Sequence, residues 1–281
     1  MLGHMIKRVL SRNKDIIVKS THHSPSMDDL YFNAENGIKD LKKICYKAGP
    51  FNYIINCIGI LNSSIVKKNP DSVFRANQVN NLFPHALCKF AKEISANIIQ
   101  ISTDGVFSND SNICKEDKKP NSSDLYGKTK ALGEVISPNY LNIRCSIIGP
   151  SPYIKKGIFS WVLSQDRGAT INGFVDQTWC GITTLQFANL CQLLIMDNYF
   201  DLVSKESSIH HFCPNKKVSK FDLLKLLIFY FRPDLSINST TSNHNSITRI
   251  LETNYITIKQ KINFDNPLNE AIIDLKNEIE C

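Results

Sequence analysis

Short apolar runs alternate with segments of helical spacing through the first half of the chain. Runs that predict strands cover residues 15–20 (DIIVKS), 51–60 (FNYIINCIGI), 96–103 (ANIIQIST) and 140–149 (YLNIRCSIIG). Apolar residues at helical spacing predict helices over 34–49, over 69–94 with a bend or break at Pro84, and over 124–134. This alternation favours βαβ units and therefore an α/β, Rossmann-like, doubly wound parallel sheet.

The pattern changes after about residue 150. Proline and loop residues become more frequent, and two helical segments, 183–198 and 219–231, alternate with short extended pieces such as SIHHFC at 208–213. We therefore predict a parallel-sheet domain over 1–150 and a smaller α+β portion over 151–281.

Composition indicates a soluble globular protein, because 42% of the 281 residues are hydrophobic and 21% are charged. The net charge of +7 comes from scattered lysines, as on a solvated surface, and it also suits an anionic ligand such as a nucleotide. The sequence has no basic stripe interleaved with aromatic residues, which argues against nucleic acid. It also has no long apolar run and no cleavable signal, so we expect a cytoplasmic protein without a membrane partner.

The nine cysteines favour reduced thiols. Their number is odd and none lies in a C-x-x-C pair, while Cys57, Cys145 and Cys191 fall within apolar runs. This pattern predicts buried free thiols rather than a disulfide framework or a zinc site, and no metal site is expected.

Three separate segments fall at predicted strand carboxyl ends: 56–59, 102–104 and 145–148. In open parallel sheets, ligands bind in the crevice beyond these ends. The segments therefore predict one shared binding crevice.

Tyr126 and Lys130 stand four residues apart in the predicted helix DLYGKTKALGE, and so lie on one helix face. A nearby ammonium lowers the pKa of a phenol, and such a tyrosine can protonate a carbonyl oxygen. Ser102 or Thr103 would supply the hydroxyl that orients this oxygen. A surface helix explains the spacing alone equally well, but the order of the segments favours the catalytic interpretation.

The segments INCIGIL, ISTDGVF and LYGKTKALGE resemble the extended short-chain dehydrogenase/reductases, and more closely the dTDP-4-dehydrorhamnose reductase family. The resemblance implies reduction of the 4-keto group of a dTDP- or UDP-linked 6-deoxy-hexose for surface polysaccharide synthesis. The cofactor would be NADPH or NADH, bound by residues 1–150, with the substrate held mainly by 151–281. The resemblance is compatible with a homodimer.

The same resemblance implies roles for single residues. Tyr126 would be the general acid, Lys130 would hold the nicotinamide ribose and lower the pKa of the tyrosine, and Thr103 would polarise the C4 carbonyl. The implied cofactor contacts are Leu2, Gly3, Asn33, Asn56, Cys57, Ile58, Gly59, Ser102, Tyr126, Lys130, Cys145, Ser146 and Ile147. The implied substrate contacts are Thr103, Asp104, Trp179 and Thr183, although Trp179 fits a core position equally well.

Two positions depart from the family pattern. The chain begins MLGHMIKRVL, so Gly3 matches the last glycine of the family's G-x-x-G-x-x-G, while the first strand and first two glycines are missing. We expect either a misassigned start or a truncated product, with two facing strand edges left unpaired or closed onto each other. The second departure is Gly105, where the family usually has an aromatic residue or cysteine. It is either a tolerated loop change or a sign of a looser substrate pocket.

Cofactor choice and two alternative functions stay open. No acidic residue follows DIIVKS to bind a ribose 2′-hydroxyl, which favours NADPH or dual use. The fold would also suit a non-catalytic or degenerate binding or regulatory subunit, or a sugar-nucleotide epimerase or dehydratase. Extra acid or base groups for an epimerase or dehydratase are not identifiable in the sequence.

Overall fold

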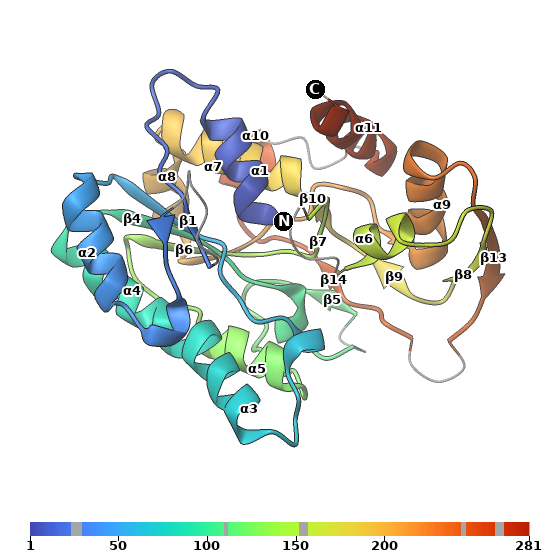
Figure 1. Cartoon of the computed structure of the whole chain (residues 1–281), viewed down its shortest axis with the longest axis horizontal. Coiled ribbons are helices and arrows are strands. Elements are labelled where there is room, and N and C mark those ends of the chain that lie inside the picture. The colour runs from blue at the N-terminus through green and yellow to red at the C-terminus, as the bar shows by residue number, and fades with distance from the viewer. Residues whose placement is uncertain (24–29, 110–111, 152–156, 243–245, 262–266, 281) are drawn as a thin grey trace.

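A four-stranded parallel sheet forms the centre of the chain (Figure 1). The structure, a computed structural model, describes residues 1–23, 30–109, 112–151, 157–242, 246–261 and 267–280. The strand order is β11–β6–β4–β3, formed by Ile209–His211, Tyr140–Arg144, Asn97–Ile101 and Tyr53–Asn56. All three pairings are parallel, as predicted from the alternation of strands and helices.

Helices cover both faces of this sheet. Successive side chains of a strand point to opposite faces, so neighbouring strand residues belong to different clusters. Ile99 and Leu141 belong to one hydrophobic cluster, and their neighbours Ile98 and Tyr140 belong to another. The first cluster includes residues from α1 (Leu2–Leu10), α7 (Thr184–Met196) and α8 (Tyr199–Glu206), and the second from α2 (Lys39–Ala48) and α4 (Phe83–Glu93). The predicted doubly wound α/β class is confirmed.

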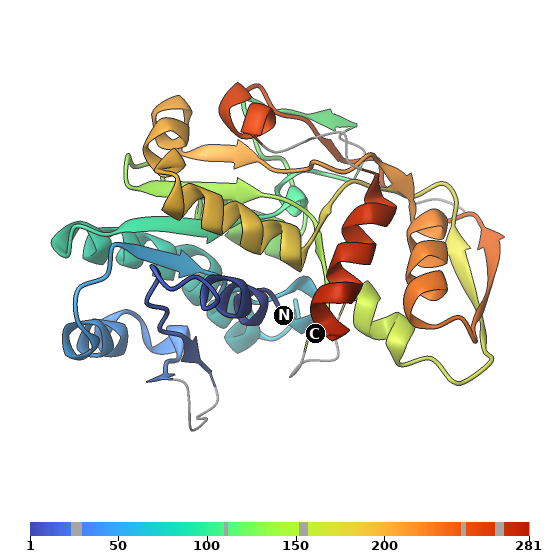
Figure 2. The same cartoon turned by 90° about the horizontal axis from the view of Figure 1, so that it is seen from above.

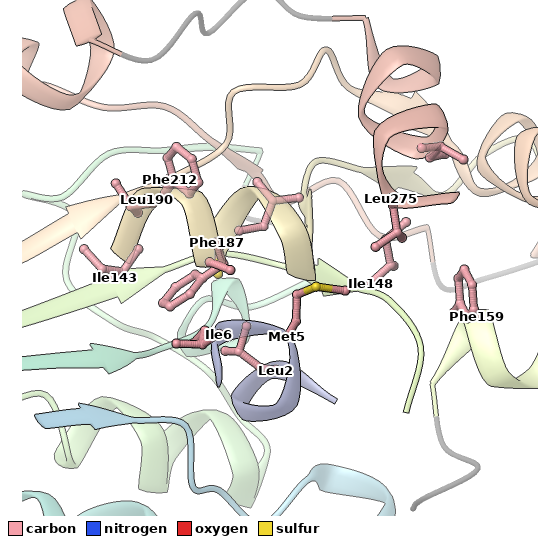
Figure 3. Packing of buried hydrophobic residues seen from close by; sticks show 14 of the residues in the cluster. Leu2, Met5, Ile6, Ile143, Ile148, Phe159, Phe187, Leu190, Phe212 and Leu275 are labelled. Atoms are coloured by element: carbon pink, nitrogen blue, oxygen red, sulfur yellow. The ribbon is translucent and has the colours of Figure 1, made fainter. Parts of the chain in front are cut away.

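The amphipathic helix α1 packs into the larger cluster. Figure 3 shows Leu2, Met5 and Ile6 of α1 directed toward the cluster that contains Phe187 of α7. The C-terminal helix α11 (Leu268–Glu280) joins the same cluster. Its residue Glu278 also binds Arg8 and Arg12 of α1. The amphipathic C-terminal segment therefore packs on its own chain.

The strand predicted over 15–20 is wrong. These residues have no strand assignment, and Ile17 is 87% exposed. Strand structure begins only at β1 (Thr21–His22), which pairs with β2 (Leu30–Tyr31) outside the main sheet. The chain before β1 thus does not close onto β3, which is an edge strand among the described residues. A β-branched run becomes a strand only where a neighbouring backbone offers hydrogen bonds.

The C-terminal half contributes to the main sheet and also builds a smaller layer beside it (Figure 2). This layer contains the parallel strands β8 (Thr170–Phe174) and β13 (Ser236–Thr240), together with α6 (Ile158–Leu163) and α9 (Lys220–Phe231). Helix α11 contacts both α7 and α9 and so stands between the layer and the main sheet. No helix within the described ranges is long and apolar enough to cross a membrane.

Short strand pairs connect distant segments of the chain. The pairs are β7 (Ile147–Ile148) with β10 (Ile182–Thr183), β9 (Thr178–Trp179) with β12 (Val218–Ser219), and β5 (Ile113–Cys114) with β14 (Ile250–Leu251). The remaining helices are α3 (Pro70–Asn77), α5 (Leu125–Leu132) and α10 (Ile256–Lys261), with short 3₁₀ turns at Ala34–Asn36, Asn62–Ser64 and Asp104–Val106.

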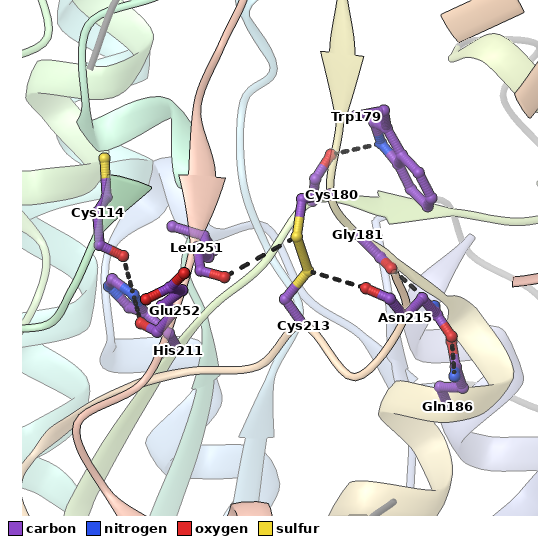
Figure 4. The surroundings of a disulfide bond; sticks show 11 residues. Cys114, Trp179, Cys180, Gly181, Gln186, His211, Cys213, Asn215, Leu251 and Glu252 are labelled. Carbon is purple, nitrogen blue, oxygen red and sulfur yellow. Dashed lines mark hydrogen bonds between the residues drawn. A yellow bond between two sulfur atoms is a disulfide. The ribbon is translucent and has the colours of Figure 1, made fainter. Parts of the chain in front are cut away.

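The expectation that the cysteines are all free is corrected at one pair. Cys180 and Cys213 form a disulfide across 33 residues of sequence, linking the β9–β10 turn to the segment after β11 (Figure 4). Free thiols are found at Cys45, Cys57, Cys88, Cys114, Cys145 and Cys191. Cysteine spacing did not reveal the pair because tertiary packing brings the two residues together.

We expect the double substitution Cys180→Ser and Cys213→Ser to lower the free energy of unfolding by about 3–4 kcal/mol, because a cross-link over a loop of this length restricts the unfolded chain. Urea unfolding of the oxidised protein, compared with the double variant, measures the difference. A reductant should destabilise the parent protein and leave the variant unchanged. Equal stability of the oxidised parent and the variant would contradict the prediction.

Candidate active site

The structure brings Thr103 and Tyr126 together at the carboxyl end of β4. Thr103 follows this strand and caps the 3₁₀ turn Asp104–Val106, with its Oγ1 accepting the Gly105 N–H at 3.0 Å. Tyr126 lies in the first turn of α5, where the Asp124 carboxylate caps the helix by accepting the Gly127 N–H at 2.7 Å. The helix cap and the strand end thus fix the two side chains independently.

Gly105 lies against both of these groups. A methyl group placed on it would lie 3.2 Å from Thr103 Oγ1 and 3.4 Å from Tyr126 Cε1. A larger side chain would crowd both groups. The departure from the family pattern therefore places a residue without a side chain in close contact with the predicted reacting groups.

Burial raises the pKa of the Tyr126 phenol to about 12. The nearby Asp104 also raises it, while hydrogen bonding with the Thr103 side chain has the opposite effect. The expectation that Lys130 lowers the pKa of Tyr126 is corrected, because desolvation of the phenolate dominates. The phenol therefore keeps its proton at neutral pH.

Lys130 is buried on the same helix, and its Nζ donates to the Ile101 carbonyl at 2.8 Å. Burial lowers the pKa of its ammonium to about 8, although Glu134, Cys145 and Cys57 favour the charged form. The amine lies at the end of β4, next to the turn that carries Thr103.

A buried asparagine that the sequence interpretation missed supports this region. Asn80 lies in a π-helical turn, Gln78–Leu82, between α3 and α4. Its side chain accepts the Ile60 N–H at 2.8 Å and donates to the Ile60 carbonyl and to Thr129 Oγ1. π-Helical turns occur frequently at functional sites. Pro84, at the start of α4, was the sequence signal for an interrupted helix.

A second missed feature is the buried pair Glu134–Arg144. The carboxylate accepts from Arg144 Nε at 2.8 Å and from Nη2 at 2.7 Å. The Ser102 hydroxyl also donates to Glu134, at 2.6 Å. Ser102 was predicted to face the cofactor, but the structure uses its hydroxyl to complete this buried pair.

The predicted cofactor contacts at the end of β3 include a hydrogen-bonded residue, Asn56, and a residue that lies against helix α1, Cys57. Asn56 is buried, donating to Gln100 Oε1 and accepting the Ile58 N–H. Gly3 lies against Cys57, since a methyl group on Gly3 would be 3.7 Å from Cys57 Cβ. The start of α1 therefore lies beside the end of β3.

Other predicted cofactor contacts have structural partners. Leu2 is a core residue, and Asn33 caps a 3₁₀ turn by accepting the Glu35 N–H. Cys145 is buried after β6, and Ile147 pairs with β10 as part of β7. Ser146 Oγ accepts a hydrogen bond from Trp179 Nε1 at 2.9 Å.

Two predicted substrate contacts are buried and have structural partners. Thr183 is fully buried and forms a capping box with Gln186 at the start of α7, so its hydroxyl is used within the helix cap. Trp179 is a buried member of the larger cluster, in agreement with its alternative interpretation as a core residue. Asp104, in contrast, is partly exposed and forms an ion pair with Arg249.

Comparison with known proteins places the chain in a family. The family described as RmlD substrate binding domain matches residues 36–246. The chain belongs to this family. No match is found among curated protein sequences.

Solved structures of dTDP-4-dehydrorhamnose reductases share the fold of this family member. The enzyme from Clostridium acetobutylicum is 20% identical, with a TM-score of 0.73 over 100% of this chain and 96% of that chain. The enzyme from Yersinia enterocolitica is 17% identical, with a TM-score of 0.74 over 99% and 96%. The Bacillus anthracis enzyme in complex with NADP is 17% identical, with a TM-score of 0.67 over 89% and 90%.

Proposed function

We propose that this protein reduces the 4-keto group of a nucleotide-linked 6-deoxy-hexose with NADPH or NADH, and that the product is used for a surface polysaccharide. The observation that carries the proposal is the convergence of Thr103, Tyr126 and Lys130 at the carboxyl end of β4. The fold that the chain shares with dTDP-4-dehydrorhamnose reductases, one of them bound to NADP, supports it.

The residues at the strand ends fit a nicotinamide cofactor. A methyl group on Gly59 would lie 3.5 Å from Asn80 Oδ1 and 4.0 Å from Lys130 Nζ, so the glycine leaves room beside two polar groups. Lys130 and the backbone at Gly59 would hold the nicotinamide ribose, and the start of α1 beside Cys57 suits a pyrophosphate. When bound, the cofactor supplies a hydride to the carbonyl carbon.

Tyr126 is the proton donor in this proposal. Its raised pKa keeps the phenol protonated, so it can transfer its proton to the carbonyl oxygen as negative charge develops there. The Thr103 hydroxyl, which is hydrogen-bonded to the same phenol, orients the carbonyl oxygen before the proton is transferred. Gly105 lets the turn after β4 approach both groups closely.

The proposal is tested by following NADPH absorbance with dTDP-4-dehydrorhamnose and with its UDP-linked counterpart. We expect one NADPH to be oxidised for each sugar reduced. An epimerase or dehydratase returns its cofactor unchanged, so net oxidation separates these classes. NADPH binding without oxidation on any 4-keto sugar nucleotide would contradict a reductase and favour a binding subunit.

We expect turnover to fall as pH rises through about 8, because the Lys130 ammonium loses its proton there. The neutral amine is a weaker donor for a ribose hydroxyl, and it no longer contributes positive charge beside the site. Initial rates between pH 6 and 10 at saturating cofactor and substrate test this expectation. Lys130→Arg retains the charge and should flatten the decline, whereas a level profile of the parent enzyme to pH 9.5 would contradict it.

A further inference from the structure

The Cys180–Cys213 disulfide joins two segments that support the carboxyl end of β6 (Figure 4). On the Cys180 side, the β9–β10 turn holds Ser146 at two points. Trp179 Nε1 donates to Ser146 Oγ at 2.9 Å, and the Ile182 N–H donates to the Ser146 carbonyl at 2.8 Å. This half of the disulfide is therefore covalently continuous with the residues that fix Ser146.

On the Cys213 side, the segment after β11 supports the same strand end. The N–H of Phe212, the residue before Cys213, donates to the Arg144 carbonyl at 2.9 Å. Cys145 follows Arg144 and is close enough to Lys130 to favour its charged form. The disulfide thus links two supports of this strand end, which lies near the lysine predicted to hold the cofactor.

The two cysteines also share a hydrophobic cluster with the turn that follows Thr103. Cys180 and Cys213 belong to this small cluster together with Val106 and Phe107. Val106 ends the 3₁₀ turn that Thr103 caps, and Phe107 follows it. A change at the disulfide therefore reaches the candidate site from two directions, through the end of β6 and through the turn after β4.

The chemistry of the pair favours reversible oxidation. The six other cysteines in the described part of the chain are thiols. The sequence predicts a cytoplasmic protein, and disulfides in that compartment are rare and are usually redox-active. Cys180 and Cys213 are 6% and 9% exposed, so a reductant reaches them when the turn opens locally.

A second, non-covalent link joins the same two segments. Asn215 Nδ2 donates to the Gly181 carbonyl at 2.7 Å, and the Gln186 side chain is hydrogen-bonded to the Asn215 side chain at 2.9 Å. Figure 4 shows these hydrogen bonds beside the disulfide. Because they do not depend on the sulfur–sulfur bond, reduction should loosen the end of β6 without unfolding the chain.

We propose that Cys180–Cys213 is a reversible redox site whose disulfide form binds NADPH more tightly than its dithiol form. The assignment rests on the nicotinamide cofactor of the proposed function. Loosening the end of β6 leaves more of the cofactor site to be ordered on binding, and this conformational cost weakens the affinity. A dithiol reductant thus lowers cofactor occupancy, and an oxidised dithiol restores it.

Reduction proceeds by thiol–disulfide exchange with a dithiol. A thiolate of the reductant attacks Cys213 Sγ, the bond between the two Sγ atoms breaks, and Cys180 leaves as a thiolate that takes up a proton. The second thiol of the reductant then attacks the mixed disulfide and releases the Cys213 thiol. Two electrons and two protons pass from the reductant to the pair, and the reductant ends as a disulfide.

NADPH affinity of the full chain, measured by calorimetry for the oxidised protein and then in dithiothreitol, tests the proposal. We expect reduction to weaken binding roughly five- to tenfold and reoxidation to restore it. By linkage, NADPH should shift the equilibrium with dithiothreitol toward the protein disulfide by the same factor. Cys180→Ser combined with Cys213→Ser should bind NADPH as the reduced parent does, in either condition. Cys88→Ser is the matched control and should respond as the parent does, because Cys88 is a buried thiol of α4 in a different hydrophobic cluster.

Hydrogen exchange gives a local readout that does not require NADPH. The Ile182 amide should exchange faster in the reduced protein, because its acceptor Ser146 is less firmly held. Unchanged exchange of this amide, equal NADPH affinity in both redox states, or global unfolding on reduction would each overturn the proposal. Redox-dependent NADPH affinity without oxidation of NADPH by any 4-keto sugar nucleotide would support the redox site and contradict the proposed reduction. Turnover with equal NADPH affinity in both states would do the reverse, so the two failures are distinguishable.

Discussion

Replacing Tyr126 with Phe is expected to lower kcat for the reduction of the 4-keto sugar by about 10²–10⁴-fold, the usual contribution of a positioned general acid. The substitution removes one oxygen atom and keeps the ring that packs beside Gly105. Because the phenol of Tyr126 holds its proton to a pKa of about 12, the parent enzyme has a proton donor throughout the neutral range that the variant lacks. Stopped-flow absorbance of NADPH in single turnovers measures the loss directly.

Cofactor affinity distinguishes loss of the general acid from damage to the cofactor site. We expect Tyr126→Phe to bind NADPH as the parent protein does, and to melt at a similar temperature. Tyr46→Phe provides a matched control, since Tyr46 is an exposed tyrosine on α2. A variant that retains parental kcat would remove Tyr126 from the mechanism.

The predicted reacting residues were recognisable because each depends on local sequence. Tyr126 and Lys130 lie four residues apart on one helix. Thr103 follows β4, a strand that is recognisable from its run of apolar residues. Parallel strands end at a common edge, so the order of these segments along the chain was enough to place them together. The helix cap at Asp124 then holds Tyr126 in the position that the order predicts.

Partners that meet through tertiary packing were not predictable in this way. The disulfide joins Cys180 to Cys213 because a turn and a strand end meet in space. Among the described residues, 15–20 do not pair with the open edge of β3, and their β-branched side chains alone do not form a strand. Thr183 is different, because its capping box with Gln186 is recognisable in the local sequence TTLQ.

The stability prediction with the largest effect concerns the buried pair Glu134–Arg144, whose side chains are 3% and 1% exposed. Arg144→Met should lower the free energy of unfolding by about 3–5 kcal/mol, because the Glu134 carboxylate would remain buried without its cation. Glu134→Gln should also destabilise the protein, because the Arg144 guanidinium would remain buried without its carboxylate. Arg144 Nη1 also donates to His211 Nε2, and burial together with the Arg144 charge lowers the pKa of His211 to about 4, so this imidazole is a neutral acceptor that cannot replace the carboxylate.

A double-mutant cycle in urea distinguishes loss of charge balance from loss of packing. If the cost of each single variant is an unpaired buried charge, Glu134→Gln combined with Arg144→Met removes both charges and should cost clearly less than the sum of the two single changes. Additive losses would instead assign the effect to packing, including the contact of Arg144 with the Phe107 ring.

Lys42→Met breaks the surface ion pair with Glu93 and should change stability by about 0–1 kcal/mol, because water screens that pair. Since Ser102 bonds to Glu134 and immediately precedes Thr103, the single variants should also lower kcat, whereas Lys42→Met should not.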